Sequence, residues 1–100
     1  MILITQLIYI IPGQEEIFNE FESLAIPLIS KYNGRLLFRV RPAENDFIEI
    51  SIDNPYEIHL VEFNNQQDID DFMKDEERKK FLYLKEKSIK SSILIQGSKL

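Results

Sequence analysis

The sequence predicts an α+β domain whose elements follow the order β-α-β-β-α-β. Three patterns support this class: a β-branched apolar run near the N-terminus, alternating apolar and polar residues in the middle of the chain, and two segments with apolar residues at helical spacing. The 100 residues fit one domain spanning 1–100, because no linker, repeat or low-complexity segment divides them. A chain of this length buries roughly two-thirds of its unfolded surface, which suffices for one hydrophobic core.

The first strand is predicted at 2–11, and both of its faces are apolar. Gln6 interrupts one face, and a buried amide there would need a hydrogen-bonding partner. Pro12 and Gly13 end the strand. A strand that is apolar on both faces requires a cover on each of them. Its two faces consist of Ile2, Ile4, Ile8 and Ile10 on one side and of Leu3, Leu7 and Ile11 on the other.

The first helix is predicted to begin beside Glu15 and Glu16, whose negative charge suits the start of a helix. Pro27 lies within the helical pattern and should kink or split the helix, because it lacks a backbone donor. Asn33 or Gly34 can end the segment in the left-handed conformation. The buried stripe of this helix consists of Ile17, Phe21, Leu24, Ala25 and Leu28.

Two further strands are predicted at 35–41 and 56–63. Asn54 and Pro55 form a turn before the second of them. The segment 46–53 also alternates, and we interpret it as a hairpin arm or a strand extension. Alternation divides the strand 35–41 into a face with Leu36, Phe38 and Val40 and a face with Arg35, Leu37, Arg39 and Arg41.

The C-terminal third predicts a second helical region and a last strand. Asn65 can cap a helix that starts at Gln66, and Asp75 can cap a new start after a local break. A short strand at 92–96 ends at Gly97. The apolar stripe of the helical region consists of Ile69, Phe72, Met73, Phe81, Leu82, Leu84 and Ile89.

The two apolar faces of the segment 2–11 predict a homodimer. Two helical regions can cover only one face of a sheet, so the other face needs a different cover. The simplest cover for so small a chain is a second copy of the same sheet, packed face to face under two-fold symmetry.

Composition and charge exclude several classes of site. The absence of cysteine removes disulfides, thiolate zinc sites, iron–sulfur ligation and cysteine nucleophiles. The net charge is −5 without a basic stripe, so we expect no nucleic-acid partner and interpret Arg78, Lys79 and Lys80 as a solvated helix face. We expect no metal or cofactor, since a single histidine offers little beyond carboxylates as ligands. The segment 2–11 lacks a basic start and is shorter than the roughly 20 residues that span a bilayer, so we expect no membrane association and take the cytoplasm as the default location.

Several short segments form one ordered pattern along nearly the whole chain. They are a strand running into Pro12-Gly13, the sequence Tyr32-Asn33-Gly34-Arg35-Leu36-Leu37, the pair Arg41-Pro42, the strand 55–63, the segment 75–81 and the ending 89–97. In this order they resemble the dimeric α/β-barrel superfamily, and within it a branch of short uncharacterised bacterial proteins. The resemblance implies a ferredoxin-like monomer with an antiparallel sheet, and a barrel formed by the facing sheets of two monomers.

The superfamily that the chain resembles has several activities. They include cofactor-free monooxygenases acting on aromatic polyketides, muconolactone-isomerase-like enzymes, haem-processing proteins and stress-responsive or ligand-binding modules. Many hold a small, mostly apolar organic molecule between sheet and helices. The chain has no tryptophan and one histidine, so the haem-binding relatives are poor guides, and no catalytic residue is carried over.

The polar residues of the predicted strands are the candidate site. His59 could act as a general base or could be a hydrogen-bonded structural histidine. If the strands 35–41 and 56–63 pair, Arg39 and Arg41 lie near Glu57 and His59, either as cross-strand ion pairs or as binders of a ligand carboxylate. The candidate ligand-binding residues are Gln6, Tyr9, Arg39, Arg41, Tyr56, Glu57 and His59, and His59 is the catalytic candidate.

The sequence favours a homodimer that binds a small apolar or amphipathic organic molecule, fatty-acid-like or an aromatic acid, in a sheet-lined pocket. One alternative is a cofactor-independent monooxygenase or isomerase that uses His59 or a tyrosine for acid–base chemistry. Another is a structural or regulatory dimer with a filled core and no ligand. The sequence decides neither whether the chain is an enzyme nor whether a sheet–helix or a sheet–sheet cavity is used.

Overall fold

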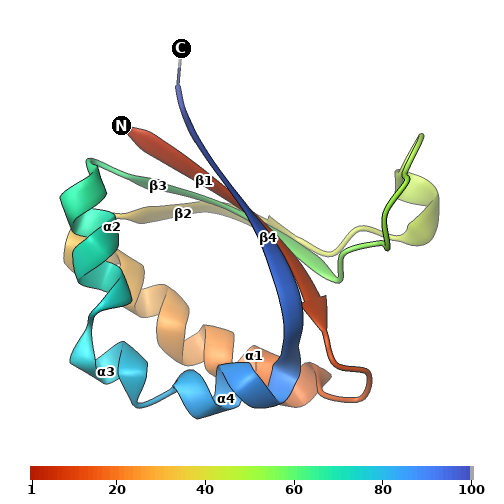
Figure 1. The fold of residues 1–100 in the computed structure, drawn as a ribbon, viewed down its shortest axis with the longest axis horizontal. Helices are drawn as coiled ribbons and strands as arrows, with labels where there is room; N and C mark the ends of the chain where they lie inside the picture. Colours follow the sequence, from red (N-terminus) through yellow and green to blue (C-terminus); the bar gives the residue numbers. More distant parts are fainter. Residues whose placement is uncertain (100) are drawn as a thin grey trace.

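The computed structural model describes residues 1–99, which form an antiparallel four-stranded sheet with helices on one face (Figure 1). The strand order is β2-β3-β1-β4, and helices follow β1 and β3 in the chain. The predicted α+β class and element order are therefore confirmed. The strands are β1 (Ile2–Ile10), β2 (Arg35–Val40), β3 (Glu57–Phe63) and β4 (Ile89–Ser98).

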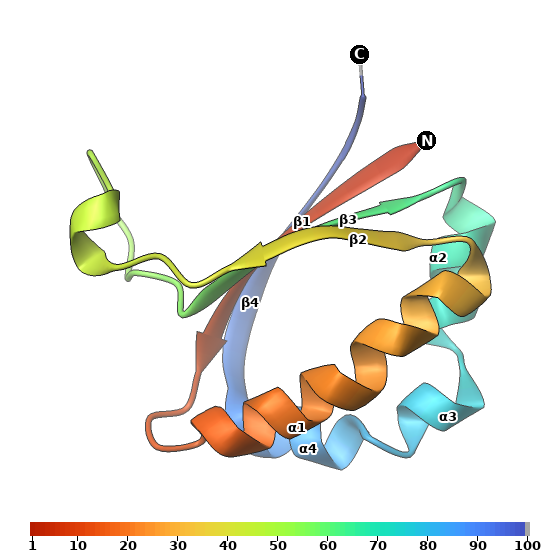
Figure 2. The same ribbon diagram turned by 180° about the vertical axis from the view of Figure 1, so that it is seen from behind.

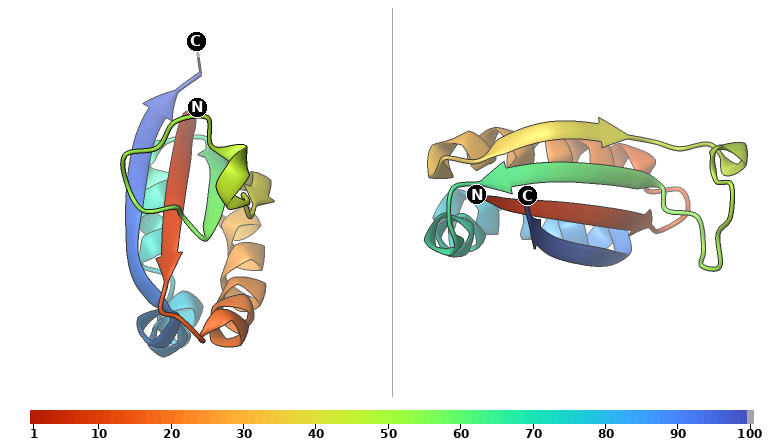
Figure 3. Two further views of the ribbon diagram at one scale, coloured as in Figure 1. Left: turned by 90° about the vertical axis from the view of Figure 1, so that its right-hand side faces the viewer. Right: turned by 90° about the horizontal axis from the view of Figure 1, so that it is seen from above.

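β1 lies at the centre of the sheet between β3 and β4, and its even-numbered residues face the helices. Ile4 and Ile8 are buried there, and Gln6 pairs with His59 of β3. Figure 3 shows the sheet as one layer and the helices as a second layer beneath it. The opposite side of the sheet, here called the open face, carries Leu3, Leu7, Phe38, Val40, Ile58, Leu60, Ile93 and Ile95.

The helical segment after β1 divides at Pro27, as predicted. The α-helix α1 (Glu15–Ala25) is followed by the 3₁₀-helix η1 (Ile26–Tyr32), and both run along the sheet (Figure 2). Asn33 ends η1 with a φ of 60°. At Gly34 a methyl group would lie 2.6 Å from both the Ile29 and the Phe63 side chains, so only glycine lets β2 begin this close to the core.

A β-bulge in β2 overturns the predicted face of one arginine. Leu36 pairs with Val61 and Phe38 with Leu60, so Leu37 is an extra residue without a partner in the register. Odd-numbered residues of β2 face the open side before the bulge and the helix side after it. Arg35 consequently lies on the open face, where it forms an ion pair with Glu62 at 2.9 Å.

Arg39 and Arg41, beyond the bulge, lie on the helix side of the sheet beside Glu57, so the prediction that all three arginines share a face was wrong. Alternation in a sequence cannot reveal an inserted residue, because a bulge leaves no compositional mark at Leu37.

The segment 46–53 is not a strand, contrary to the interpretation as a hairpin arm or strand extension. It follows the short 3₁₀-helix η2 (Glu44–Asp46) and projects beyond the end of the sheet (Figures 1 and 3). Ile48 is fully exposed there, and the Tyr9 hydroxyl donates a hydrogen bond to the backbone oxygen of Asp53 at 2.8 Å. Alternation alone does not form a strand when no neighbouring edge pairs with the segment.

Three short helices connect β3 to β4: α2 (Gln66–Met73), α3 (Glu76–Lys79) and α4 (Leu82–Ser88). Both predicted caps are confirmed. Asn65 accepts a hydrogen bond from the Asp68 amide at 2.9 Å, and Asp75 accepts one from the Arg78 amide at 2.7 Å. β4 is longer than the predicted 92–96, because its pairing with β1 starts at Ile89 and continues through Ser98.

The hydrophobic core consists of two clusters between sheet and helices. Ile4, Ile29, Phe63 and Ile69 form one, and Phe21, Ala25 and Leu84 form the other. The two clusters leave a cavity between them, and the candidate site lies in this cavity.

Candidate functional site

A cavity of about 240 Å³ lies between the sheet and the helices. Apolar side chains from both core clusters form most of its wall, and this cavity is here called the sheet–helix cavity. Polar side chains enter it from both layers, which is the composition expected of a small-molecule site. They are Gln6, Glu22, His59, Arg78, Lys85, Ser92 and Gln96.

His59 reaches the cavity from β3 and is held by Glu57, two residues earlier on the same face. The Nε2 atom of His59 is hydrogen-bonded to a carboxylate oxygen of Glu57. Arg39, across from His59 in β2, donates from Nε and Nη2 to the same carboxylate at 2.8–3.1 Å. Arg41 donates to it from Nε at 2.7 Å.

Glu57 is ionised, and this fixes the tautomer of His59. Burial alone would raise the pKa of Glu57, whose side chain is 1% exposed. Hydrogen bonds from His59 and Arg41 and the charge of Arg39 outweigh burial and hold that pKa at about 2. An ionised carboxylate only accepts hydrogen bonds, so the hydrogen lies on Nε2 of His59. In the neutral imidazole, Nδ1 is then a lone-pair acceptor, and it has no hydrogen-bond partner within residues 1–99.

A surface cleft on the other side of Glu57 contains the two arginines and Asn19. Arg41 donates to the Asn19 side-chain oxygen at 2.5 Å and lies over the Tyr56 ring, 4.9 Å from its centroid. Glu57 thus connects the solvent-facing arginines to the histidine of the cavity through one chain of hydrogen bonds.

Three ionisable side chains of the cavity come from the helices: Glu22 from α1, Arg78 from α3 and Lys85 from α4. Glu22 is 6% and Arg78 8% exposed. Among the described residues, none of the three side chains forms a hydrogen bond or an ion pair; the guanidinium of Arg78 lies over the Phe72 ring. Burial raises the pKa of Glu22 and lowers the pKa values of Arg78 and Lys85.

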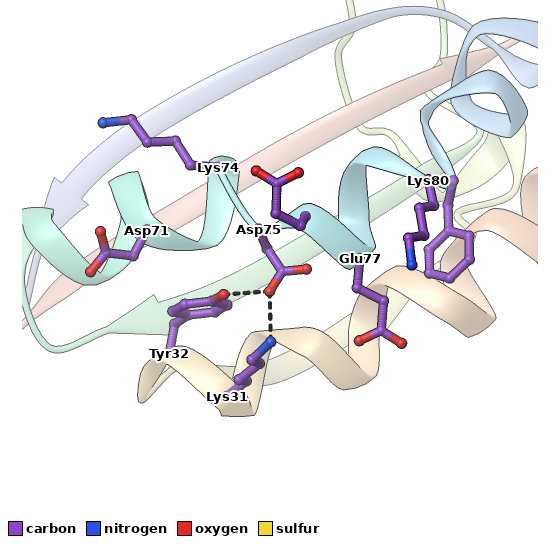
Figure 4. Close-up of a pocket in the computed structure, with 9 residues that line it drawn as sticks. Lys31, Tyr32, Asp71, Lys74, Asp75, Glu77 and Lys80 are labelled. Atoms are coloured by element: carbon purple, nitrogen blue, oxygen red, sulfur yellow. Dashed lines mark hydrogen bonds and ion pairs between the residues drawn. The ribbon is translucent and has the colours of Figure 1, made fainter.

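Asp75 holds α3, and with it Arg78, in place. Its carboxylate accepts hydrogen bonds from the Tyr32 hydroxyl and from Lys31 Nζ, the latter at 2.9 Å (Figure 4). Its other oxygen accepts the Arg78 amide. The hydrogen bond from Tyr32 is the main reason why the pKa of Asp75 lies well below its usual range. In the open groove around Asp75 this carboxylate is paired with Lys31, whereas Glu22, Arg78 and Lys85 of the sheet–helix cavity form no ion pair within residues 1–99.

The predicted site residues separate into three groups in space. Gln6 and His59 line the cavity, and Glu57, Arg39 and Arg41 lie directly behind His59. Tyr9 lies on the open face, bonded to the segment 46–53. Tyr56 packs edge-on against Phe18, with ring centroids 5.8 Å apart, and does not line the cavity.

Sequence reasoning missed Glu22, Arg78 and Lys85. Glu22 lies three residues before Ala25 on the apolar stripe of α1, and a carboxylate on such a stripe was a detectable signal. Arg78 is buried, so the interpretation of its basic run as a solvated face was wrong for this residue. The Arg78 side chain points inward because helical breaks lie on either side of α3. These breaks disturb the helical periodicity on which the prediction depended.

Two kinds of site are absent from the part of the chain that the structure describes. No cluster of three or more histidine, cysteine, aspartate or glutamate side chains is arranged to hold a metal ion. No helix there has the length and apolar character needed to cross a bilayer.

Comparisons with known proteins establish the fold. No protein-family model and no curated protein sequence matches the chain. The methylated RPA0582 protein of Rhodopseudomonas palustris superposes with a TM-score of 0.85 at 13% identity, over 99% of this chain and 80% of that one. A NIPSNAP domain protein of Burkholderia xenovorans gives 0.73 at 9% identity, over 100% and 95% of the two chains.

The description of a third similar structure names its fold. It is a dimeric protein of unknown function and ferredoxin-like fold from Bacteroides fragilis, which superposes with a TM-score of 0.70 at 12% identity, over 96% of this chain and 93% of that one. Identities this low bear on the fold alone. Together with the strand order β2-β3-β1-β4, they show that the chain has the predicted ferredoxin-like α+β fold.

Proposed function

We propose that the chain is a homodimer that binds a small organic acid in the sheet–helix cavity. The observation that carries this proposal is the pair Arg78 and Lys85 in a mostly apolar cavity, where neither cation forms an ion pair with a described residue. A buried cation without a partner costs free energy, and a ligand carboxylate is the group that would compensate for it.

The size of the cavity limits the size of the ligand that it can hold. At about 240 Å³ it is smaller than the roughly 300–1,000 Å³ of pockets for drug-sized molecules. This favours a compact aromatic or short-chain acid over a long-chain fatty acid. An unfilled cavity with charged walls also disfavours the alternative of a purely structural dimer, which would have a packed interior.

The open face supports the dimer. Within residues 1–99, all helices cover the other side of the sheet, so no helix covers the apolar side chains of the open face (Figure 3). Phe38 is 48% and Ile95 54% exposed on it. A contiguous apolar surface of this kind marks an interaction site, and a second copy offers a matching surface. The similar Bacteroides fragilis protein is described as dimeric.

Replacing Arg78 by Gln tests the ligand proposal. We expect benzoate to bind the wild-type protein and the Arg78→Gln variant to bind it at least about tenfold more weakly, because a charge-assisted hydrogen bond is lost. Isothermal titration calorimetry measures both affinities. Lys80→Gln is the matched control, since Lys80 is exposed two residues away and does not line the cavity. Equal losses in both variants, or no benzoate binding to the wild type, would contradict the proposal.

A second candidate function is proton transfer, and the Glu57–His59 pair favours it. A carboxylate that orients an imidazole and leaves its other nitrogen toward a cavity is the arrangement of a general base. A cofactor-independent isomerase or monooxygenase would use His59 in this way.

Deuterium exchange in D₂O tests this second candidate. We expect the protein to accelerate exchange of the protons beside the ketone of levulinate, a small keto acid, and His59→Ala to abolish that acceleration. Proton NMR follows the exchange, and circular dichroism checks that the variant folds. Exchange at the buffer rate with the wild-type protein would eliminate levulinate-type chemistry while leaving the binding proposal intact.

A further inference from the structure

The polar groups of the sheet–helix cavity are of two kinds. Arg78 and Lys85 are donors, and a ligand carboxylate matches them. Glu22 and the Nδ1 atom of His59 are acceptors, and a carboxylate does not match these. A ligand with an acid group alone would therefore leave two acceptors unpaired in an apolar enclosure, which is costly.

Of these two acceptors, Glu22 provides the stronger evidence for the chemistry of the ligand. Its side chain is more than nine-tenths buried, lines the cavity and has no hydrogen-bond or ion-pair partner among residues 1–99. Burial is the largest influence on its pKa, which it raises.

We propose that the ligand is a compact hydroxy acid, whose carboxylate contacts Arg78 and Lys85 and whose hydroxyl or enol group donates a hydrogen bond to Glu22. This inference rests on the proposed function and names the substrate class of the same site. A carboxyl group retains an acceptor oxygen whether or not it is protonated, so Glu22 can receive the hydroxyl in either state. A site with a buried polar group rejects analogues that lack the partner group more strongly than it rejects a small change in size.

A matched series of probes tests the inference on the unmodified protein. Benzoate supplies the acid alone, 3-hydroxybenzoate and 4-hydroxybenzoate add a donor at two positions, and the corresponding methoxybenzoates keep the oxygen but replace its hydrogen by a methyl group. We expect at least one hydroxybenzoate to bind at least about tenfold more tightly than benzoate, and its methyl ether to lose that gain. Calorimetric titration of the whole chain gives the affinities.

Glu22→Gln and Glu22→Leu locate the effect at one residue. Both variants should still bind benzoate, the Gln variant should lose part of the preference for the hydroxyl, and the Leu variant should lose all of it. Glu20→Gln, exposed on the same helix, is the control that should leave this preference unchanged.

The possible outcomes distinguish the hydroxy-acid inference from the acid-binding function on which it rests. If benzoate binds through Arg78 but the hydroxybenzoates bind no better, or if the preference survives Glu22→Leu, the hydroxy-acid inference is overturned and the acid-binding function stands. If no member of the series binds, both are overturned.

Discussion

Replacing Leu60 by Asp is expected to convert the proposed homodimer into a folded monomer. Leu60 lies on the open face of β3, between Thr5 of β1 and Phe38 of β2, at the middle of the sheet. A carboxylate there would be buried against apolar side chains in the dimer but exposed to water in the monomer. Losing about 4 kcal/mol of association energy would raise the dissociation constant by roughly a thousandfold.

Size-exclusion chromatography with light scattering, at micromolar protein, measures the effect of Leu60→Asp. Far-UV circular dichroism should remain that of the wild type, because Leu60 faces away from the helices. Tyr83→Asp is the control, since Tyr83 is a 54% exposed apolar side chain on α4 and lies outside the open face. A monomeric wild-type protein, or a Leu60→Asp variant that stays dimeric, would rule out the face-to-face arrangement.

Replacing Glu57 by Ala is expected to lower the free energy of unfolding by about 1–3 kcal/mol, the usual cost of leaving the hydrogen-bonding partners of a buried group unsatisfied, because Arg39 and Arg41 keep access to solvent. The variant would leave Arg39, Arg41 and His59 around a cavity without a countercharge. Urea denaturation at pH 7 measures the loss. Glu76→Ala removes only an exposed pair with Lys79 and should cost less than about 1 kcal/mol. Similar losses in the two variants would mean that the buried network contributes little to stability.

Glu57 also makes the stability depend on pH. Its pKa in the folded protein is about 2, below its ordinary value of 4.5. The folded state therefore binds the proton less readily than the unfolded chain does, and the carboxylate stabilises the fold. That contribution is complete above about pH 4.5 and is lost as the pH falls toward about 2. Glu57→Gln should flatten this part of the stability profile, as followed by thermal unfolding between those pH values.

Local chemistry that acts within a few residues could be predicted from the sequence. Pro27 divides the first helical segment, and Asn65 and Asp75 cap helices, because each effect depends on one side chain and the adjacent backbone. The two apolar faces of β1 were visible for the same reason. The pairing of Arg39 with the β3 face was also predictable, since opposite charges commonly meet across neighbouring strands.

Features that depend on distant neighbours could not be predicted. The segment 46–53 alternates like a strand but has no strand beside it, and Arg78 turns inward because α3 is displaced by breaks at both ends. The strand residues Gln6, Glu57 and His59 of the candidate site were found from the sequence. Arg78 was not accessible in this way, and the signal of Glu22 on the apolar stripe of α1 was overlooked.

The extra residue at Leu37 gives β2 two roles along one short strand. Before it, Arg35 belongs to the surface that would meet another copy of the chain; after it, Arg39 belongs to the wall behind the cavity. Deleting Leu37 would make the alternation of β2 continuous and leave these faces unchanged, with Arg35, Phe38 and Val40 on the open face and Arg39 and Arg41 on the helix side. The inserted residue thus explains why Arg35 and Arg39, four positions apart in the sequence, lie on opposite faces of the sheet.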